Sequence, residues 1–256
     1  ISLSMKSFVF PHQHSYRVVQ LTDCHLLAQP DAWYQGCQPA LHLQQIIAFL
    51  QSDRPDAVIL TGDLTQDHSA ASYALLAELL CPLDCPVFLV PGNHDDLNLL
   101  TELTQRRPFV AAESLLLADW QLFLLDSKGP TPAGSFPQPK QQGLEQQFRQ
   151  STSAHFWLFM HHHPQPLACF IDQYGLTEQQ AFWQLLQAEP RVRGLSHGHA
   201  HLAYQRQQQG IQLVGCPASS VQFLETPDWQ TVNQGPQWCE WQFSAGGTVR
   251  WQFKRI

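Results

Sequence analysis

The sequence has little charge and no cluster of basic residues. Only 14% of its 256 residues are charged, and the formal net charge is −7. Proteins held on nucleic acid by phosphate contacts usually carry a basic patch, so polymeric nucleic acid is not an expected partner. No apolar run approaches the length of a membrane-spanning helix, so insertion into a membrane is not expected either.

Paired cysteines are also lacking. The chain has seven cysteines, an odd number, and none of them forms a Cys-x-x-Cys pair. This spacing argues against structural zinc and against a disulfide framework, so free thiols in a reducing compartment are expected. The N-terminus lacks the basic-then-apolar layout of a signal peptide, and a cytoplasmic location is the resulting expectation. We expect Met5 to be the natural start and residues 1–4 to be a cloning scar or upstream read-through.

The first half of the chain alternates strand-like and helix-like patterns. Apolar runs over 17–22, 57–62 and 87–92 predict buried strands. Between them, apolar residues spaced three and four apart over 43–50 and 73–80 predict helices. This β-α-β-α-β order implies a largely parallel sheet with right-handed crossovers.

The second half begins with the same two patterns and ends in short strands. Strands are predicted over 120–127 and 156–163, and helices over 140–150 and 177–189. After residue 201 short strands and turns predict a β-rich second sheet. No linker is long or polar enough to separate domains, so a single domain over 5–256 is expected, with two stacked sheets and helices outside.

Metal-binding side chains follow the strand-like runs. Five segments share this position: Asp23-Cys24-His25, Gly62-Asp63, Gly92-Asn93-His94-Asp95, His161-His162-His163 and Gly198-His199-Ala200-His201. In open α/β sheets, ligand groups gather beyond the carboxyl ends of strands. In an extended backbone, the side chains of residues i and i+2 point to the same side. Each of two pairs is therefore expected to bind one ion: Asp23 with His25, and His199 with His201. Carboxylate, amide and imidazole groups at successive strand ends predict a two-metal phosphoester hydrolase.

These segments carry a family resemblance. Their order is D-x-H, G-D, G-N-H-D, an apolar strand ending in His-His, and G-H-x-H, and through it nearly the whole chain resembles the calcineurin-like metallophosphoesterases. Within that superfamily the sequence is most similar to the bacterial class III cyclic nucleotide phosphodiesterases, through LTDCHLLAQ, TGDLTQDHSAASY, VPGNHDD, HHHPQP and CPASSVQF. Pattern and resemblance together imply an α/β fold, a four-layer α-β-β-α sandwich in which two stacked mixed β-sheets are flanked by helices.

The resemblance implies a ligand set for two divalent ions. One ion takes Asp23, His25, Asp63 and His201, and the other takes Asp63, Asn93, His161 and His199, so that Asp63 bridges. His162 and His163 are expected behind the ligands or in the turn, and His197 is an alternative ligand. Asn93, His94 and His162 are the candidates for substrate binding.

The donor types limit the metals and suit the reaction. Asp and His bind Mn²⁺, Fe²⁺ or Zn²⁺ without selecting sharply among them. We expect an Fe/Mn centre, with Zn, Co or Mg as alternatives. Two divalent ions bring four positive charges and two aspartates remove two, and the residual charge attracts a monoanionic phosphodiester and stabilises its transition state.

A mechanism follows as a hypothesis. Two ions roughly 3.5–4 Å apart acidify a bridging water, whose hydroxide attacks phosphorus in line. His94 follows the ligand Asn93, so its side chain is expected to leave on another heading, toward the substrate, and to protonate the leaving alkoxide as general acid. Asp95 is expected to orient His94 as a neighbouring carboxylate.

The resemblance implies hydrolysis of 3′,5′-cyclic AMP to 5′-AMP, with a small-molecule phosphodiester as the partner and no prediction of oligomeric state. One alternative is a broader phosphodiesterase acting on glycerophosphodiesters, 2′,3′-cyclic nucleotides or aryl phosphates. Another is a non-catalytic metal-binding scaffold, which would be expected to have lost ligands or the acid. Base-contacting residues are sought in 128–139, 165–176 and 219–223.

Several other residues receive ordinary interpretations. Surface or satisfied core positions are expected for His12, His14, His42, His68 and His155. Cys24 is expected to pack in the core, and Asp126 to cap the loop that follows it. Trp33, Trp229 and Trp238 are candidates for the rim of a pocket.

Overall fold

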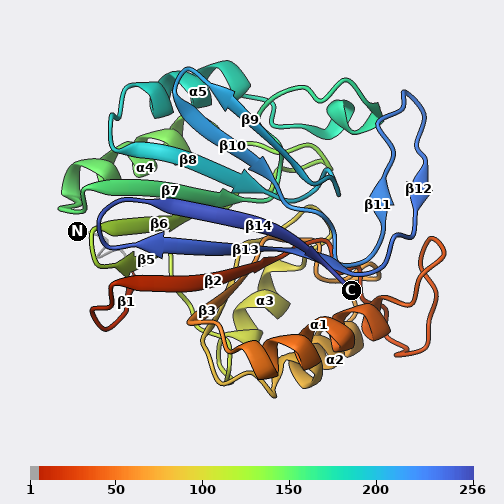
Figure 1. Cartoon of the computed structure of the whole chain (residues 1–256). Helices are drawn as coiled ribbons and strands as arrows, with labels where there is room; N and C mark the ends of the chain where they lie inside the picture. Colours follow the sequence, from red (N-terminus) through yellow and green to blue (C-terminus); the bar gives the residue numbers. More distant parts are fainter. Residues whose placement is uncertain (1–5) are drawn as a thin grey trace.

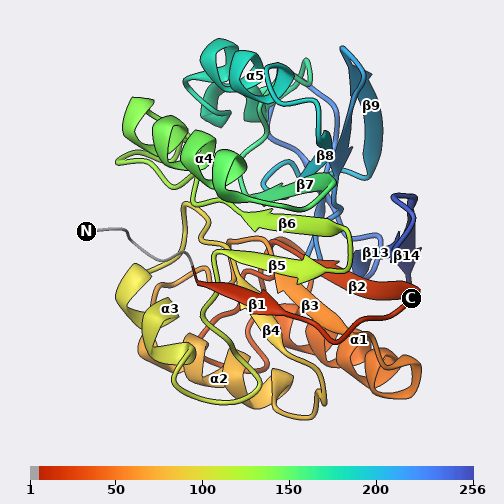
Figure 2. The same cartoon turned by 90° about the vertical axis from the view of Figure 1, so that its left-hand side faces the viewer.

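Two β-sheets pack face to face, and helices cover their outer sides (Figure 1). The structure is a computed structural model that describes residues 6–256; Met5 and the expectation about residues 1–4 lie outside the described residues. Figure 2 shows α1, α2 and α3 on one outer side and α4 and α5 on the other. This arrangement confirms the predicted four-layer α-β-β-α sandwich.

The first sheet has five strands in the order β14-β13-β2-β3-β4. Their bounds are Ser15–Leu21 (β2), Ala57–Leu60 (β3), Val87–Leu89 (β4), Gln237–Ser244 (β13) and Val249–Arg255 (β14). β2, β3 and β4 are parallel, as the alternating pattern predicted, whereas β13 runs antiparallel to β2. The parallel strands bring three of the five ligand-bearing segments to one edge of this sheet.

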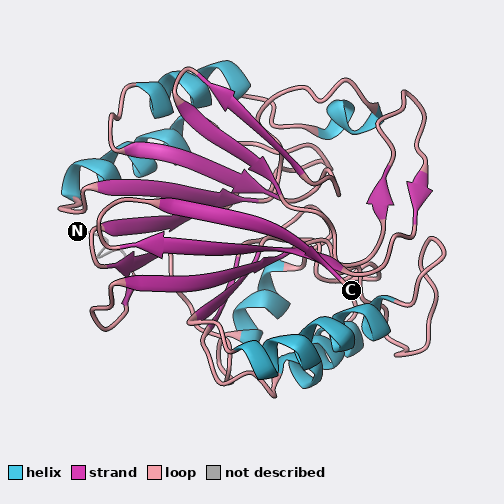
Figure 3. Cartoon of the chain, viewed as in Figure 1, coloured by secondary structure: helices cyan, strands magenta, loops and turns pink. Residues whose placement is uncertain are grey.

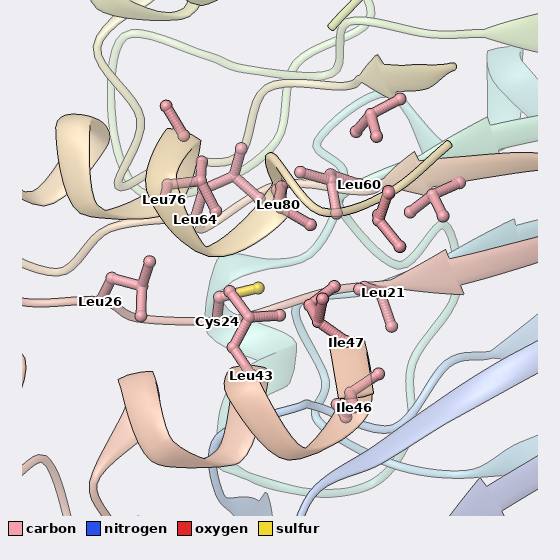
Figure 4. Close-up of a cluster of buried hydrophobic side chains, with 14 of the residues drawn as sticks. Leu21, Cys24, Leu26, Leu43, Ile46, Ile47, Leu60, Leu64, Leu76 and Leu80 are labelled. Atoms are coloured by element: carbon pink, nitrogen blue, oxygen red, sulfur yellow. The ribbon is translucent and has the colours of Figure 1, made fainter. Parts of the chain in front are cut away.

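Three helices cover the outer face of this sheet: α1 (Pro39–Asp53), α2 (Ala70–Leu80) and α3 (Leu97–Leu103). Pro39 suits the first turn of α1, where a missing backbone N–H costs nothing. The Ser69 hydroxyl and the Asp96 carboxylate accept backbone N–H groups at the starts of α2 and α3. Leucine and isoleucine side chains from these helices and strands form one buried cluster (Figure 4). Cys24 lies in this cluster, which confirms its predicted packing role.

The second sheet has seven strands in the order β1-β5-β6-β7-β8-β10-β9. Their bounds are Ser7–Val9 (β1), Ser114–Leu117 (β5), Trp120–Leu124 (β6), His155–Met160 (β7), Val192–His197 (β8), Tyr204–Gln208 (β9) and Ile211–Gly215 (β10). The outer helices are α4 (Gln138–Gln150) and α5 (Gln179–Gln187).

Among the elements of residues 6–256, no helix is both long and apolar enough to cross a membrane.

The C-terminal strands do not form a sheet of their own, so that prediction was wrong. β9 and β10 extend the seven-stranded sheet, while β13 and β14 extend the five-stranded sheet. The reason lies in burial: Cys239, Trp241 and Phe243 alternate along β13 and fill the core between the two sheets. A 3₁₀-helix, η1 (Phe170–Tyr174), and a small hairpin of β11 (Gln222–Phe223) with β12 (Thr231–Val232) stand apart from both sheets.

Candidate metal centre

The seven predicted ligands meet where strands of both sheets end. Asp23 and His25 follow β2, Asp63 follows β3 and Asn93 follows β4, all in the five-stranded sheet. From the seven-stranded sheet, His161 follows β7, and His199 and His201 follow β8. Six of the seven are buried and Asn93 is partly buried. The structure therefore brings the complete predicted set together at the carboxyl ends of five strands.

The local backbone differs from the extended chain that the i, i+2 argument assumed. Five of the predicted ligands have a left-handed backbone: Asp23 (φ 53°), His25 (φ 48°), Asp63 (φ 52°), His199 (φ 63°) and His201 (φ 53°). For residues other than glycine this conformation costs on the order of 1–3 kcal/mol each. Hydrogen bonds between neighbouring loops hold it; Asp23 N–H, for example, donates to the Gly62 carbonyl at 2.9 Å. A turn of the chain at each of these five ligands, rather than strand alternation, directs their side chains inward.

The first group of donor atoms contains Asp23 Oδ1, His25 Nε2, His201 Nε2 and Asp63 Oδ2. His201 Nε2 lies 3.3 Å from Asp23 Oδ1 and 3.2 Å from His25 Nε2. His25 Nε2 lies 3.9 Å from both Asp23 Oδ1 and Asp63 Oδ2. These four atoms surround one small polar space.

The second group forms around His161 Nε2. This atom lies 3.1 Å from Asn93 Oδ1, 3.2 Å from His199 Nδ1 and 3.4 Å from Asp63 Oδ1. Asp63 thus presents one carboxylate oxygen to each group. That division is the arrangement a bridging ligand requires.

Hydrogen bonds fix which ring nitrogen of three histidines faces the centre. The Nδ1 atom pairs with the Thr61 carbonyl in His161 (2.7 Å), with the Val221 carbonyl in His201 (2.6 Å) and with the Gln66 side-chain oxygen in His25 (2.8 Å). Because each partner is an acceptor, Nδ1 carries a proton and Nε2 is the nitrogen that faces the centre. Metal-binding histidines are oriented in this way by such outer contacts.

The two aspartates are held as carboxylates. Burial would raise the pKa of Asp63, but the charge of His161 lowers it well below its ordinary value. Burial would also raise the pKa of Asp23, but His201 lowers this pKa below its ordinary value. Burial lowers the pKa of His25 to about 4, so this imidazole is neutral, the form that binds metals. Burial would also lower the pKa of His161, but Asp63 raises it to about 9.

The donor set fits divalent cations. The Nε2 atoms of His25 and His201 face each other at 3.2 Å with both lone pairs inward, which is repulsive unless a cation lies between them. Asp23 Oδ1 is buried with no hydrogen-bond partner, and a buried unpaired carboxylate oxygen is costly. Asp23, His25 and His201 offer one ligand atom each within 4.8 Å of one another, as do Asp23, Asp63 and His161. The same distance also groups His161 and His199 with His162.

Two glycines let the ligand loops approach closely. A Cβ atom on Gly92 would come within 2.3 Å of Asp63 Oδ1, and one on Gly198 would come within 1.9 Å of the Thr22 hydroxyl and 2.7 Å of Asp23 Oδ2. Both glycines precede predicted ligands in the sequence. Their lack of a side chain is therefore a steric requirement of the centre.

The structure places the side chains of His94 and Asp95 in different surroundings. The ring of His94 lines the same cavity as the donor groups, and its backbone N–H donates to Asp63 Oδ1 at 2.8 Å. The prediction that Asp95 orients His94 is wrong. The Asp95 carboxylate instead accepts hydrogen bonds from Leu64 N–H, Tyr73 O–H and Gly92 N–H, and His94 Nδ1 is buried without a hydrogen-bond partner. Adjacent residues point apart here because their loop turns between them.

We expect Asp95→Ala to act on stability. The substitution leaves three buried donors without an acceptor, and we expect a loss of about 3 kcal/mol in the free energy of unfolding and a fall in Tm of roughly 5–10 °C. Thermal unfolding against the exposed control Asp84→Ala measures this. An unchanged Tm with a large loss of turnover would restore the orienting role for Asp95.

Three further histidines, whose roles the sequence left open, lie behind the donor groups: His162, His163 and His197. Both ring nitrogens of His162 are engaged, by Ser127 Oγ at 2.9 Å and the Pro132 carbonyl at 3.2 Å, and its side chain does not line the cavity. The prediction that His162 binds substrate is therefore wrong. His197 pairs with the Gly198 carbonyl and with Tyr204 Oη at 2.5 Å, so neither of its nitrogens is free for a metal. His163 Nε2 lies 3.5 Å from Asp172 Oδ1.

A cavity of about 400 Å³ opens beside the donor groups. Of the three segments searched for base contacts, 165–176 supplies four lining residues, whereas 128–139 and 219–223 supply only Pro132 and Phe223. Trp229 lines this cavity, as predicted. Trp238 does not: it is 1% exposed and packs in the core behind the five-stranded sheet.

Sequence reasoning missed two residues next to the site. His68, expected to be an ordinary surface residue, stacks on His94 with ring centroids 5.6 Å apart. The Lys128 ammonium donates to the Asn93 carbonyl at 2.6 Å and so holds the loop after β4. His68 does not follow a strand end, and Lys128 follows a strand but is not a metal-binding residue type, so the pattern of metal-binding side chains indicated neither. The ordinary interpretations hold elsewhere: Asp126 accepts Lys128 N–H, and the buried His42 pairs with the Ser219 and Ser220 carbonyls.

Fold and site together define the chain as a metal-dependent phosphodiesterase with a binuclear divalent metal centre implied by the fold. The sequence model described as calcineurin-like phosphoesterase matches residues 16–203. The chain therefore belongs to the calcineurin-like phosphoesterase family.

Individual relatives agree with this assignment. A protein of Pseudoalteromonas sp. (strain SM9913), described as a probable cyclic nucleotide phosphodiesterase, is 37% identical over 87% of this chain and 86% of its own length. The 3′,5′-cyclic adenosine monophosphate phosphodiesterase CpdA of Vibrio vulnificus is 30% identical over 95% of this chain and 91% of its own length. A dimetal phosphatase from Danio rerio shares the fold, with a TM-score of 0.63 at 14% identity over 94% of this chain and 98% of its own.

Proposed function

We propose that this protein hydrolyses 3′,5′-cyclic AMP to 5′-AMP at a two-metal centre. The observation that carries the reaction is the division of Asp63: one carboxylate oxygen lies in each of two donor groups whose histidine ring nitrogens face inward. The choice of cyclic AMP is supported by the relatives, one of which is named for that substrate.

The ligand assignment is part of this proposal. Asp23, His25, Asp63 and His201 hold one ion, and Asp63, Asn93, His161 and His199 hold the other. When bound, the two ions activate the attacking water for in-line displacement and neutralise charge on the phosphoryl oxygens. Oxygen and imidazole donors accept Fe and Mn, the pair proposed for this centre, with Zn, Co and Mg as alternatives.

The chain's own groups complete the chemistry. Asn93 and His94 line the cavity beside the donor groups, where a phosphodiester has access to both. His94 is placed to donate a proton to the leaving alkoxide, because its ring lines the cavity that holds the donor groups. Asp63 holds His94 only through the backbone, so the ring is free to meet the substrate.

We also propose that residues 5–256 form one domain located in the cytoplasm. β13, near the end of the chain, pairs with β2, near its start, which supports a single folding unit. All seven cysteines are free thiols, which suits a reducing compartment.

A broader phosphodiesterase acting on glycerophosphodiesters or 2′,3′-cyclic nucleotides is the second candidate. Its support is the volume of the cavity beside the donor groups, about 400 Å³. The non-catalytic scaffold is disfavoured because all seven donors and His94 are present and convergent.

Substrate comparison tests the proposal. With Mn²⁺ added, we expect turnover of bis(p-nitrophenyl) phosphate and its loss on addition of EDTA, because the chelator removes the ions from the donor groups. Among physiological esters, we expect the largest kcat/KM for cyclic AMP, compared with cyclic GMP, 2′,3′-cyclic AMP and a glycerophosphodiester. If cyclic AMP is the poorest of these, the substrate assignment is wrong. If EDTA leaves turnover unchanged, the two-metal centre is wrong as well.

A further inference from the structure

We propose that four aromatic residues beside the donor groups, Phe170, Tyr174, Phe223 and Trp229, form a nucleobase-binding subsite in which Trp229 and Phe170 stack on the base. We call them the aromatic wall. The inference rests on the proposed function, because it states where the base of a cyclic nucleotide lies when its phosphate is at the metal centre.

The aromatic wall starts at a predicted ligand and leads outward. The Phe223 ring stacks on His201, with ring centroids 3.8 Å apart and planes inclined by 7°. Phe170 follows at 5.0 Å from Phe223, and Trp229 follows at 6.3 Å from Phe170. Both Phe170 and Trp229 line the same cavity as His25, His199 and His201. In a nucleotide a single ribose separates phosphate from base, so a base attached to a phosphate at His201 reaches this wall.

The outer residues of the wall present large aromatic surfaces to the cavity mouth. Trp229 is 57% exposed and Tyr174 is 36% exposed, whereas Phe223, at the inner end, is 7% exposed. Tryptophan is usually well buried, and this exposed one lies at the mouth of the cavity that holds the donor groups. Such a surface suits stacking on the flat face of a base, since this stacking tolerates any base and does not require charge.

Hydrogen bonds hold the elements that carry the wall. η1 and the β11–β12 hairpin lie side by side (Figure 3), and Phe170 N–H donates to the Thr226 carbonyl at 3.0 Å. The Asp172 carboxylate accepts Leu167 N–H at 2.7 Å and Ala168 N–H at 2.8 Å, and it lies 3.5 Å from His163 Nε2. His163 stands two residues after the predicted ligand His161, so Asp172 ties η1 to the metal centre. A surface ordered in advance loses little conformational entropy on binding.

The polar groups beside the wall also suit a base. Gln35, Gln66 and Gln173 line the cavity, and its described lining contains no lysine or arginine. Amide groups pair with the donor and acceptor edges of bases. Phosphate affinity therefore comes from the metal centre, while the wall and its amides are left to recognise an uncharged aromatic group.

A binding comparison separates the two ends of the site. Calorimetry on the Mn²⁺-loaded protein measures the dissociation constants of 5′-AMP and of ribose 5-phosphate, which lacks the base. We expect the wild type to bind 5′-AMP about tenfold more tightly or better, an effect typical of one base–aromatic stack. Trp229→Ala is expected to remove most of this preference while changing ribose 5-phosphate affinity less than about twofold, and Trp229→Phe to retain most of it.

Trp33→Ala is the matched control, because Trp33 is 67% exposed but does not line the cavity. It is expected to keep the full preference for 5′-AMP. The subsite is refuted if the wild type does not distinguish the two ligands, or if Trp229→Ala keeps the preference or weakens both ligands equally. Cyclic AMP turnover is measured on the same samples. Turnover with a preference insensitive to Trp229 refutes only the subsite, whereas a Trp229-dependent preference without turnover refutes only the proposed function.

Discussion

Replacing Asp63 by alanine is expected to reduce kcat/KM for bis(p-nitrophenyl) phosphate by at least about 1,000-fold, because two-metal sites supply several kcal/mol of transition-state stabilisation. Asp63 is a predicted ligand whose side chain faces both donor groups, with Oδ2 3.9 Å from His25 Nε2 and Oδ1 3.4 Å from His161 Nε2. Its loss removes one of the two negative charges that balance the cations. Elemental analysis should show fewer than two ions per chain.

Asp119→Ala provides the control for this experiment. Asp119 is an exposed carboxylate in the turn between β5 and β6, and β6 runs from this turn toward the metal centre, so the substitution changes the net charge in the same way at a distance from the site. It should keep both its metal content and its turnover near those of the wild type. If Asp63→Ala retains two ions per chain and turnover within about tenfold, the bridging assignment is wrong, since a tenfold change corresponds to only about 1.4 kcal/mol.

The sequence predicted the layers of the fold because its patterns are local. Apolar runs alternating with helical spacing over 17–89 are a direct consequence of burial on both faces of parallel strands, and β2, β3 and β4 appear where these runs lie. Local sequence does not decide which sheet the C-terminal strands join. β13 pairs with β2, more than two hundred residues earlier in the chain, and its alternating pattern is the same whichever sheet it joins.

The sequence predicted which residues form the candidate site but not the backbone geometry that directs their side chains. Strand ends marked every residue that now lies in the two donor groups, because the carboxyl ends of parallel strands converge. The left-handed backbone at Asp23, Asp63 and His199 was not visible, since neither aspartate nor histidine requires it. Asp95 was misjudged for the same reason: adjacency in sequence predicted contact with His94, whereas the turn directs its carboxylate toward Tyr73 and Leu64.

Substituting His94 is expected to separate proton transfer from metal binding. General acid catalysis contributes typically about 10²–10⁴-fold, so His94→Ala should lower kcat for cyclic AMP by a factor in that range while both ions stay bound. Metal content is expected to persist because His94 touches Asp63 only through its backbone N–H, which alanine keeps. His94→Ala and Asp63→Ala are therefore expected to differ in metal content, measured by elemental analysis, even though both lose turnover.

The leaving group gives a sharper test of His94. Cyclic AMP expels an alkoxide that needs a proton, whereas bis(p-nitrophenyl) phosphate expels a nitrophenolate that departs without one. We therefore expect His94→Ala to reduce turnover of the aryl substrate by no more than about tenfold, far less than that of cyclic AMP. His68→Ala is the companion variant, since His68 stacks on His94 without lining the cavity, and we expect only a small effect on both substrates. Equal losses for the two substrates in His94→Ala would mean that His94 positions the phosphate rather than protonating the leaving oxygen. Loss of metal in that variant would instead place His94 among the ligands.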